Sequence, residues 1–161
     1  MDSAYVFFYG TLMRGFDLRR RVGIDDRLRF LGLATMSGAL FDLGPYPAAV
    51  SAMQGRVHGE LYEMTRSDDV LRILDRAEAY RPADPARSLY VRRVTCARLD
   101  DGRLVPAWAY FYNASLAGAR RIPSGDYAEY VRLWGAAPWT QHSIEPCTLD
   151  RSIVGDCINE T

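Results

Sequence analysis

The pattern of hydrophobic and polar positions along the chain predicts short strands separated by loops, together with two amphipathic helices. The apolar run at residues 4–8 stops at a Gly-Thr pair, which predicts a buried strand that ends in a tight turn. Glycines scattered through a second extended segment indicate two short strands or one strongly bent strand, as at the corner of a barrel. This segment and the later extended ones are predicted over 29–43, 56–64, 89–99 and 104–112.

The segment 56–64 alternates without a purely apolar face. Val57 and Leu61 share one face with Glu63, whereas Glu60 lies on the other face with Tyr62. A strand that is mixed on both faces suits the wall of a barrel with one side lining a pocket.

An aspartate-rich turn at 100–102 is predicted to join the last two strands into a hairpin. Cys96 lies in the first of them and is predicted to be a small core residue. Trp108, Tyr110 and Tyr112 share one face of the second strand. Such an aromatic stripe usually packs in a core, but tyrosines at the mouth of a barrel also form pocket walls.

A helix is predicted over 65–78, where Thr65 and Ser67 are hydroxyl capping candidates and acids occupy the first turn. Leu71, Leu74 and Glu78 fall on one stripe, because residues three and four apart share a helix face. A carboxylate carried inward on that stripe would respond to the loss of water with a raised pKa, which suits a general base near neutral pH. The alternative is that Glu78 lies at the frayed helix end, solvated or paired with an arginine.

A second helix is predicted after Ser124-Gly125-Asp126, with Tyr127, Tyr130, Val131 and Trp134 on its packed face. The pattern dissolves beyond it. We therefore expect one domain over 1–135, followed by an irregular tail over 136–161.

Composition narrows the classes of function. A chain of 161 residues suits a single domain with a sizeable core, and its formal net charge of zero argues for neither nucleic acid nor a charged membrane surface. All its basic residues are arginines, so Schiff-base, PLP and Walker A lysine chemistry is excluded. The cluster at 19–21 is read as a solvated face, with a role toward a substrate carboxylate as the alternative.

Cysteine and histidine spacing points to no cofactor. Cys96, Cys147 and Cys157 match neither a disulfide framework nor a zinc site, and the two histidines, His58 and His142, lack metal-ligand spacing. A Ser-His-Asp or Cys-His site built on His58 has no supporting partner in the pattern. With no basic leader and no apolar span, we expect a soluble, cytoplasmic, metal-free protein that acts without a cofactor.

The turn at Tyr9-Gly10-Thr11-Leu12 is the most informative stretch. Gly10 lets the backbone adopt a positive φ or approach another group closely. The following N–H groups can then converge on an anion or an oxyanion. A plain structural turn is the alternative.

These blocks together resemble the gamma-glutamylcyclotransferase-like (AIG2-like) family over about residues 4 to 133. The blocks that carry the resemblance, in chain order, are Tyr9-Gly10-Thr11-Leu12, Gly44-Pro45-Tyr46-Pro47, Val57-His58-Gly59-Glu60-Leu61-Tyr62, Leu74-Asp75-Arg76-Ala77-Glu78-Ala79-Tyr80 and Arg121-Ile122-Pro123-Ser124-Gly125-Asp126-Tyr127. Two departures are Ala79, where the family more often has glycine, and the tail 136–161, which matches no family segment.

The resemblance implies an α+β fold, a small and mostly antiparallel β-barrel with flanking helices and a pocket at its mouth. It implies conversion of a γ-glutamyl amide or peptide to 5-oxoproline and a free amine, with Glu78 as acid/base. The loop of Tyr9, Gly10, Thr11 and Leu12 would bind the glutamyl group, and no metal is needed. Tyr110 and Tyr112 are the candidate pocket walls.

Two other hypotheses remain open from the sequence. The first is a non-catalytic binding module that uses the same pocket for a small acidic ligand or a partner, and would tolerate glutamine at Glu78. The second is a hydrolase in which Glu78 activates water, distinguished by a product that is not cyclic. The amine portion of the substrate and the oligomeric state are not determined by the sequence.

Overall fold

The computed structural model describes residues 3–135. The strands are β1 (Tyr5–Phe8), β2 (Leu28–Ser37), β3 (Ala39–Asp42), β4 (Pro47–Val50), β5 (Arg56–Met64), β6 (Tyr90–Leu99), β7 (Leu104–Tyr112) and β8 (Arg120–Ile122). The α-helices are α1 (Leu18–Arg21), α2 (Ser67–Ala77) and α3 (Tyr127–Trp134), and the short 3-10 helices are η1 (Asp25–Arg27) and η2 (Pro85–Arg87). Within this part of the chain, every helix is too short or too polar to cross a lipid bilayer.

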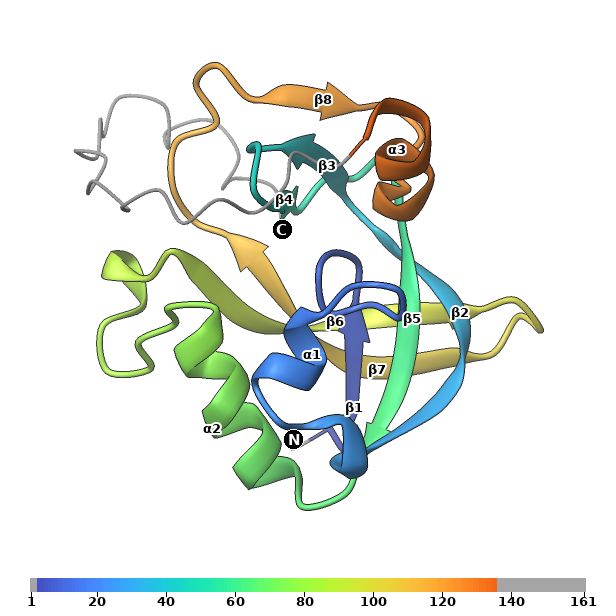
Figure 1. Ribbon diagram of the computed structural model, residues 1–161, viewed down its shortest axis with the longest axis vertical. Helices are drawn as coiled ribbons and strands as arrows, with labels where there is room; N and C mark the ends of the chain where they lie inside the picture. Colours follow the sequence, from blue (N-terminus) through green and yellow to red (C-terminus); the bar gives the residue numbers. More distant parts are fainter. Residues whose placement is uncertain (1–2, 136–161) are drawn as a thin grey trace.

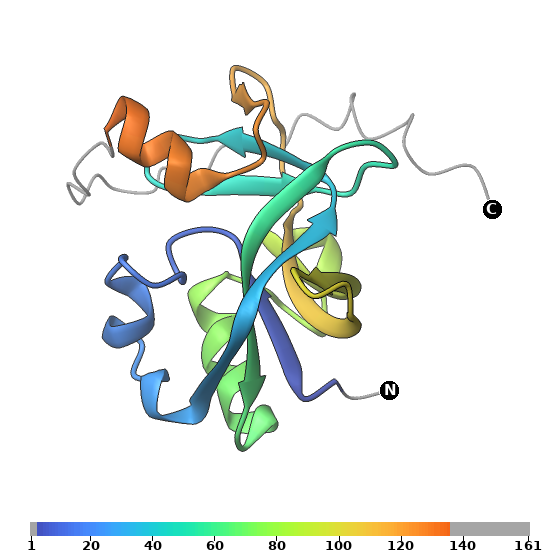
Figure 2. The same cartoon turned by 90° about the vertical axis from the view of Figure 1, so that its right-hand side faces the viewer.

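Five strands close into a barrel in the order β1-β5-β2-β6-β7 (Figures 1 and 2). Neighbouring strands are antiparallel except β1 and β7, which run parallel and close the barrel where Val6 lies opposite Trp108. The predicted small, mostly antiparallel barrel is therefore confirmed. The glycine-rich segment forms two separate strands, β2 and β3, which are divided by Gly38. A bulge between Phe30 and Gly32 bends β2 further.

A second sheet of order β4-β3-β8 lies at one end of the barrel, with α3 beside it (Figures 1 and 2). The Tyr130 hydroxyl of α3 donates a 2.6 Å hydrogen bond to Asp42 at the end of β3. The sequence pattern does not predict β4 or β8. They are four and three residues long, too short to establish an alternation, and β4 begins inside the proline-rich loop.

Helix α2 packs along the outside of the barrel through Val70, Leu71 and Leu74, all of which are buried. The acids in its first turn are present as predicted. The predicted hydroxyl cap is wrong: the residue at the N-cap is Arg66, in the left-handed region at φ 56°, and no side chain caps the helix. Thr65 lies one residue before the cap and Ser67 is already the first helical residue, so neither hydroxyl is at the capping position.

The hairpin and the start of the last helix are confirmed. Residues 100–102 join β6 to β7, and the Asp126 side chain caps α3 by accepting a 3.0 Å hydrogen bond from the Glu129 N–H. Two burial predictions are wrong. Cys96 is exposed, on the outer face of β6. Trp134 is the last residue of α3, immediately before Gly135, and is 73% exposed. The predicted tail, with Cys147 and Cys157, lies outside the described residues.

Candidate active site

Glu78 lies at the C-terminal end of α2, and the way this helix ends fixes its position. The Tyr80 N–H donates to the Asp75 carbonyl at 2.8 Å, and the Ala79 N–H donates to the Arg76 carbonyl at 3.2 Å. These two bonds form a Schellman motif, in which the residue after the cap adopts a left-handed conformation. Here that residue is Ala79, at φ 50°. A glycine at this position would adopt the same conformation without a strained Cβ.

The Glu78 carboxyl group is desolvated. It lies one turn beyond Leu74 on the buried stripe of α2, and its surroundings raise its pKa from 4.5 to about 7. Loss of water is the cause, since burial penalises the charged form of a carboxylic acid. Of the two alternatives from the sequence, the inward-facing carboxylate is the one that the structure supports.

Four tyrosines surround this carboxyl group. Burial raises the pKa of each hydroxyl, and the negative charge of Glu78 raises each of them further. These are Tyr9, Tyr46, Tyr90 and Tyr110, which come from the turn after β1, the loop before β4, and strands β6 and β7. Segments far apart in the sequence therefore meet at the end of α2.

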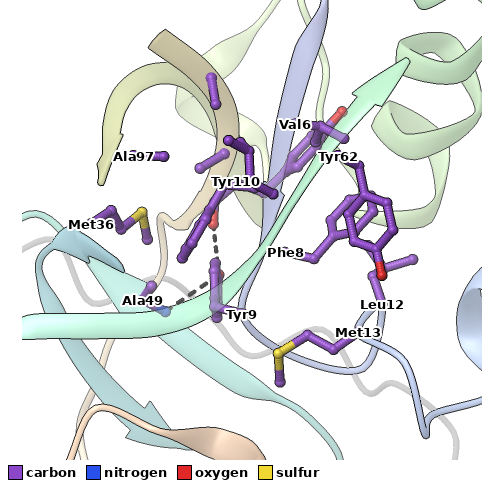
Figure 3. Packing of buried hydrophobic residues seen from close by; sticks show 14 of the residues in the cluster. Val6, Phe8, Tyr9, Leu12, Met13, Met36, Ala49, Tyr62, Ala97 and Tyr110 are labelled. Atoms are coloured by element: carbon purple, nitrogen blue, oxygen red, sulfur yellow. Dashed lines mark hydrogen bonds between the residues drawn. The ribbon is translucent and has the colours of Figure 1, made fainter. Parts of the chain in front are cut away.

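The turn after β1 packs tightly against β4 and β7. Tyr9 lies between two backbone groups: its hydroxyl donates to the Tyr110 carbonyl at 2.6 Å and accepts from the Ala49 N–H at 3.4 Å (Figure 3). Gly10 is required for close approach, because a Cβ at this position would lie 2.7 Å from Cγ of Pro47. Its φ is not positive, so the conformational alternative for this glycine is wrong.

The two residues after Gly10 present backbone donors. The Met13 N–H donates to the Gly10 carbonyl at 3.0 Å and closes a turn in which Thr11 and Leu12 are the central residues. The N–H groups of these two residues donate no hydrogen bond within residues 3–135. The Leu12 side chain is buried in the core, so only the backbone of this residue is available to a ligand.

The two candidate pocket tyrosines differ in their surroundings. Tyr110 is buried, and its hydroxyl donates a 2.6 Å hydrogen bond to Asp75 on α2, which places it among the supporting contacts of the site. Asp75 also forms an ion pair with Arg92, with 2.9 Å between Oδ1 and Nε. Tyr112 is partly exposed and packs edge-on against Tyr90, with ring centroids 5.3 Å apart.

Tyr46, Tyr90 and Tyr112 form a row of contacting rings, which we call the tyrosine wall. The ring centroids of Tyr46 and Tyr90 lie 6.1 Å apart, and the Tyr90 hydroxyl donates to the Pro47 carbonyl at 2.8 Å. Pro47 also packs against Gly10, so this one residue contacts both the tyrosine wall and the turn. Sequence reasoning placed neither Tyr46 nor Tyr90 in the site. The Gly-Pro-Tyr-Pro block contains Tyr46 and was a usable signal, whereas Tyr90 had none beyond its strand position.

Glu60 was also missed as part of the site. It is 6% exposed on β5, and its carboxylate accepts hydrogen bonds from the Arg14 N–H at 2.9 Å, the Arg14 Nε at 3.1 Å and the Tyr62 hydroxyl at 2.6 Å. Arg19 of α1 contacts the same Tyr62 hydroxyl. Arg19 thus belongs to a side-chain network with Tyr62 and Glu60. The two sequence-based alternatives for the cluster at 19–21, a solvated face or a role toward a substrate carboxylate, did not include this network.

Two hollows on the surface lie away from Glu78 and from the turn after β1. Cavities of about 500 Å³ and 300 Å³ flank β8, and neither is lined by Glu78 or by residues 9–12. His58 is exposed on β5. Among the described residues, no three His, Cys, Asp or Glu side chains are grouped so that they could hold a metal ion. Within residues 3–135, Glu78 is therefore the one carboxyl group whose pKa is raised. It is half-buried and acts electrostatically on Tyr9, at the start of the turn whose central N–H groups donate no bond in this part of the chain.

Comparison with known proteins shows that the fold is shared. YkqA from Bacillus subtilis is similar in structure with a TM-score of 0.63 and 23% identity, over 82% of this chain and 42% of YkqA. The chain thus spans less than half of that protein. The ytfP protein from Escherichia coli is similar with a TM-score of 0.54 and 28% identity, over 78% of this chain and 97% of ytfP. An AIG2-like protein from Mus musculus has a TM-score of 0.54 and 22% identity, over 71% of this chain and 81% of the mouse protein.

A search of curated protein sequences gives no match. The sequence model of the family described as gamma-glutamyl cyclotransferase, AIG2-like, matches residues 6–129, which is most of the chain and includes the turn after β1, Glu60 and Glu78. On that match, the chain belongs to the gamma-glutamyl cyclotransferase, AIG2-like family.

Proposed function

We propose that the protein is a cyclotransferase that converts a γ-glutamyl amide or peptide to 5-oxoproline and a free amine. Glu78 is the general acid/base, and the loop of residues 9–12 binds the glutamyl group. Membership in the family supports the reaction class. The observation that carries the proposal is the Glu78 pKa of about 7, beside a turn whose two central N–H groups donate no hydrogen bond within residues 3–135.

The raised pKa suits both halves of the reaction. Near neutral pH, a group with a pKa of about 7 is present in both protonation states and can accept and return a proton. The ionised Glu78 carboxylate takes a proton from the substrate's α-ammonium group. The freed amine then attacks the γ-carbonyl carbon of the same molecule and forms the C–N bond of the ring.

The tetrahedral intermediate then breaks down. The bond between the γ-carbon and the leaving nitrogen cleaves as Glu78 returns its proton to that nitrogen. The ring nitrogen, which still carries two hydrogens after the attack, gives up one of them to the Glu78 carboxylate, and this second proton passes to the departing amine, which leaves as an ammonium ion. Atoms balance without water, oxidant or cofactor. Because the attack is intramolecular, holding the substrate in a bent conformation supplies much of the rate.

The backbone donors of Thr11 and Leu12 have the complementary role. Preorganised N–H groups stabilise a carboxylate or a developing oxyanion without reorganisation during the reaction. The tyrosine wall of Tyr46, Tyr90 and Tyr112 provides a flat, apolar side for the carbon chain of the glutamyl group. Tyr110 supports the site from behind through Asp75.

The test is release of 5-oxoproline from a panel of γ-glutamyl amino acids, γ-glutamyl-ε-lysine and glutathione. We expect the wild-type chain to release it from at least one compound, and Glu78→Gln to lower kcat by several orders of magnitude. Release of linear glutamate would favour the hydrolase. A folded wild type that binds 5-oxoproline or a γ-glutamyl compound but releases nothing would favour the binding module.

A further inference from the structure

The Glu60 carboxylate is hydrogen-bonded to Arg14, the residue that follows the turn of residues 10–13. Glu60 lies in the middle of β5 and is 6% exposed. Its carboxylate accepts hydrogen bonds from both the backbone N–H and the guanidinium Nε of Arg14. A single acidic side chain is thus joined at two points to the residue that follows the turn. Surface ion pairs are usually single and exposed, so this contact differs from an ordinary solvated pair.

The two bonds leave little freedom to the loop. Arg14 immediately follows Met13, whose N–H closes the turn on Gly10, and Arg14 also lies over the Phe30 ring with its guanidinium carbon 3.6 Å from the centroid. The turn is thereby fixed by β1 at its start and by Glu60 at its end. Its central N–H groups can then point in one direction without a bond of their own.

We propose that Glu60 is a positioning residue that holds the turn of residues 10–13 in the conformation that binds the glutamyl group. This inference rests on the proposed function for its ligand, but not for its structural part. Glu60 acts through the backbone of Arg14 and does not itself touch the substrate. The Tyr62 hydroxyl, which donates to the same carboxylate, orients Glu60 toward the loop.

Replacing Glu60 with glutamine tests the role with little change in volume. An amide has one acceptor oxygen and two N–H donors, so it cannot serve all three donors that converge on the carboxylate. At least one bond to the loop or to Tyr62 is lost, and a donor then faces another donor.

The matched control is Glu63→Gln. Glu63 lies on the same strand and accepts a 2.7 Å hydrogen bond from the Arg29 Nε, but this pair is at the surface and far from the loop in the strand register. The substitution removes the same charge from β5 without touching the turn.

The first readout needs no substrate. Hydrogen exchange of the Met13 amide in the full-length protein reports opening of the turn, because that amide is bonded to Gly10 and not to Glu60. We expect Glu60→Gln to accelerate it by at least about tenfold and Glu63→Gln to leave it unchanged. Unchanged Met13 exchange in Glu60→Gln overturns the proposal.

The second readout is the split between KM and kcat for 5-oxoproline release. A loose binding loop weakens contacts made in both the ground state and the transition state, so we expect KM to rise about tenfold. A role only in stability would reduce the fraction of folded enzyme and lower the apparent kcat without moving KM. That pattern would overturn the proposal.

Two further outcomes are separated by design. If Glu60→Gln does not fold, Glu60→Asp decides: it keeps the negative charge but is shorter by one methylene, which withdraws the carboxylate from the Arg14 N–H and guanidinium, so accelerated Met13 exchange supports the proposal and unchanged exchange overturns it. If the wild type releases no 5-oxoproline, the proposed reaction fails, while the exchange comparison still supports or overturns the positioning role.

Discussion

Tyr110 connects the turn after β1 to the helix that carries Glu78. Its carbonyl accepts a 2.6 Å hydrogen bond from the Tyr9 hydroxyl, and its own hydroxyl donates a 2.6 Å hydrogen bond to Asp75 on α2. The two halves of the candidate site therefore share one residue of β7. Their relative position is fixed by two short hydrogen bonds within the barrel.

Tyr9→Phe is expected to destabilise the protein by about 1–3 kcal/mol. The substitution leaves the Tyr110 carbonyl without the hydroxyl that now pairs with it, and the Ala49 N–H loses its acceptor in a buried setting. Urea unfolding monitored by circular dichroism measures the change. Tyr5→Phe on β1, the strand that leads into the turn, is the control, since Tyr5 is only partly buried, and an equal loss in both variants would contradict the assignment.

Asp75→Asn is expected to cost about 3 kcal/mol of unfolding free energy. It removes the charge that pairs with Arg92, a side chain only 18% exposed, and weakens the hydrogen bond from Tyr110. The matched control is Asp69→Asn on the same helix, which pairs with exposed arginines and should cost no more than about 1 kcal/mol. Similar losses at the two positions would show that the pair of Asp75 with Arg92 contributes no more to the free energy of unfolding than an exposed ion pair.

Ala79→Gly is expected to stabilise the protein. A non-glycine residue in the left-handed region costs about 1–2 kcal/mol, and the extra backbone entropy of glycine offsets about 0.5–1 kcal/mol of that, so the net gain is up to about 1.5 kcal/mol. Ala77→Gly, two residues earlier at the last residue of α2, should instead lose up to about 1 kcal/mol. Thermal unfolding of the two variants should therefore shift in opposite directions, and a shared sign would refute the Schellman interpretation.

Much of the site follows from local sequence. Glu78 could be placed on the inner stripe because Leu71 and Leu74 precede it at helical spacing, and the turn at Gly10 because a buried strand ends there. The Glu60 network could not be predicted, since Arg14 is 46 residues away from Glu60 in the sequence and no periodicity links them. Partners of this kind are set by strand order and register.

The errors in burial have a related cause. Period-two alternation tells which residues share a face of a strand, but not which face is inside. Cys96 shares its face with Val94, which is 47% exposed, while Ala97 on the other face is fully buried. The face that carries Ala97 points into the barrel, and which face points inward depends on how all five strands pair. The Tyr90 contact with Pro47 likewise depends on where β4 lies, and β4 itself is too short to predict.

The pKa of Glu78 makes a prediction about stability as a function of pH. In the folded protein the group titrates near 7, whereas in the unfolded chain it titrates near 4.5, so the folded state holds the proton more tightly. Its contribution to stability is therefore fully present below about pH 4.5 and is lost as the pH rises through about 7. A shift of this size corresponds to about 3 kcal/mol.

Glu78→Gln should remove this dependence. Glutamine is neutral at every pH, so the variant should match the wild type near pH 4 and exceed its unfolding free energy by up to about 3 kcal/mol at pH 8. Urea unfolding of both proteins across this range gives the difference directly, and other titrating groups cancel because they are common to both. In the same window, kcat/KM of the wild type should rise with pH through about 7, because only the ionised carboxylate accepts the proton. A constant stability difference between the two proteins would mean that Glu78 is already ionised at pH 5, and the acid/base role would then need another residue.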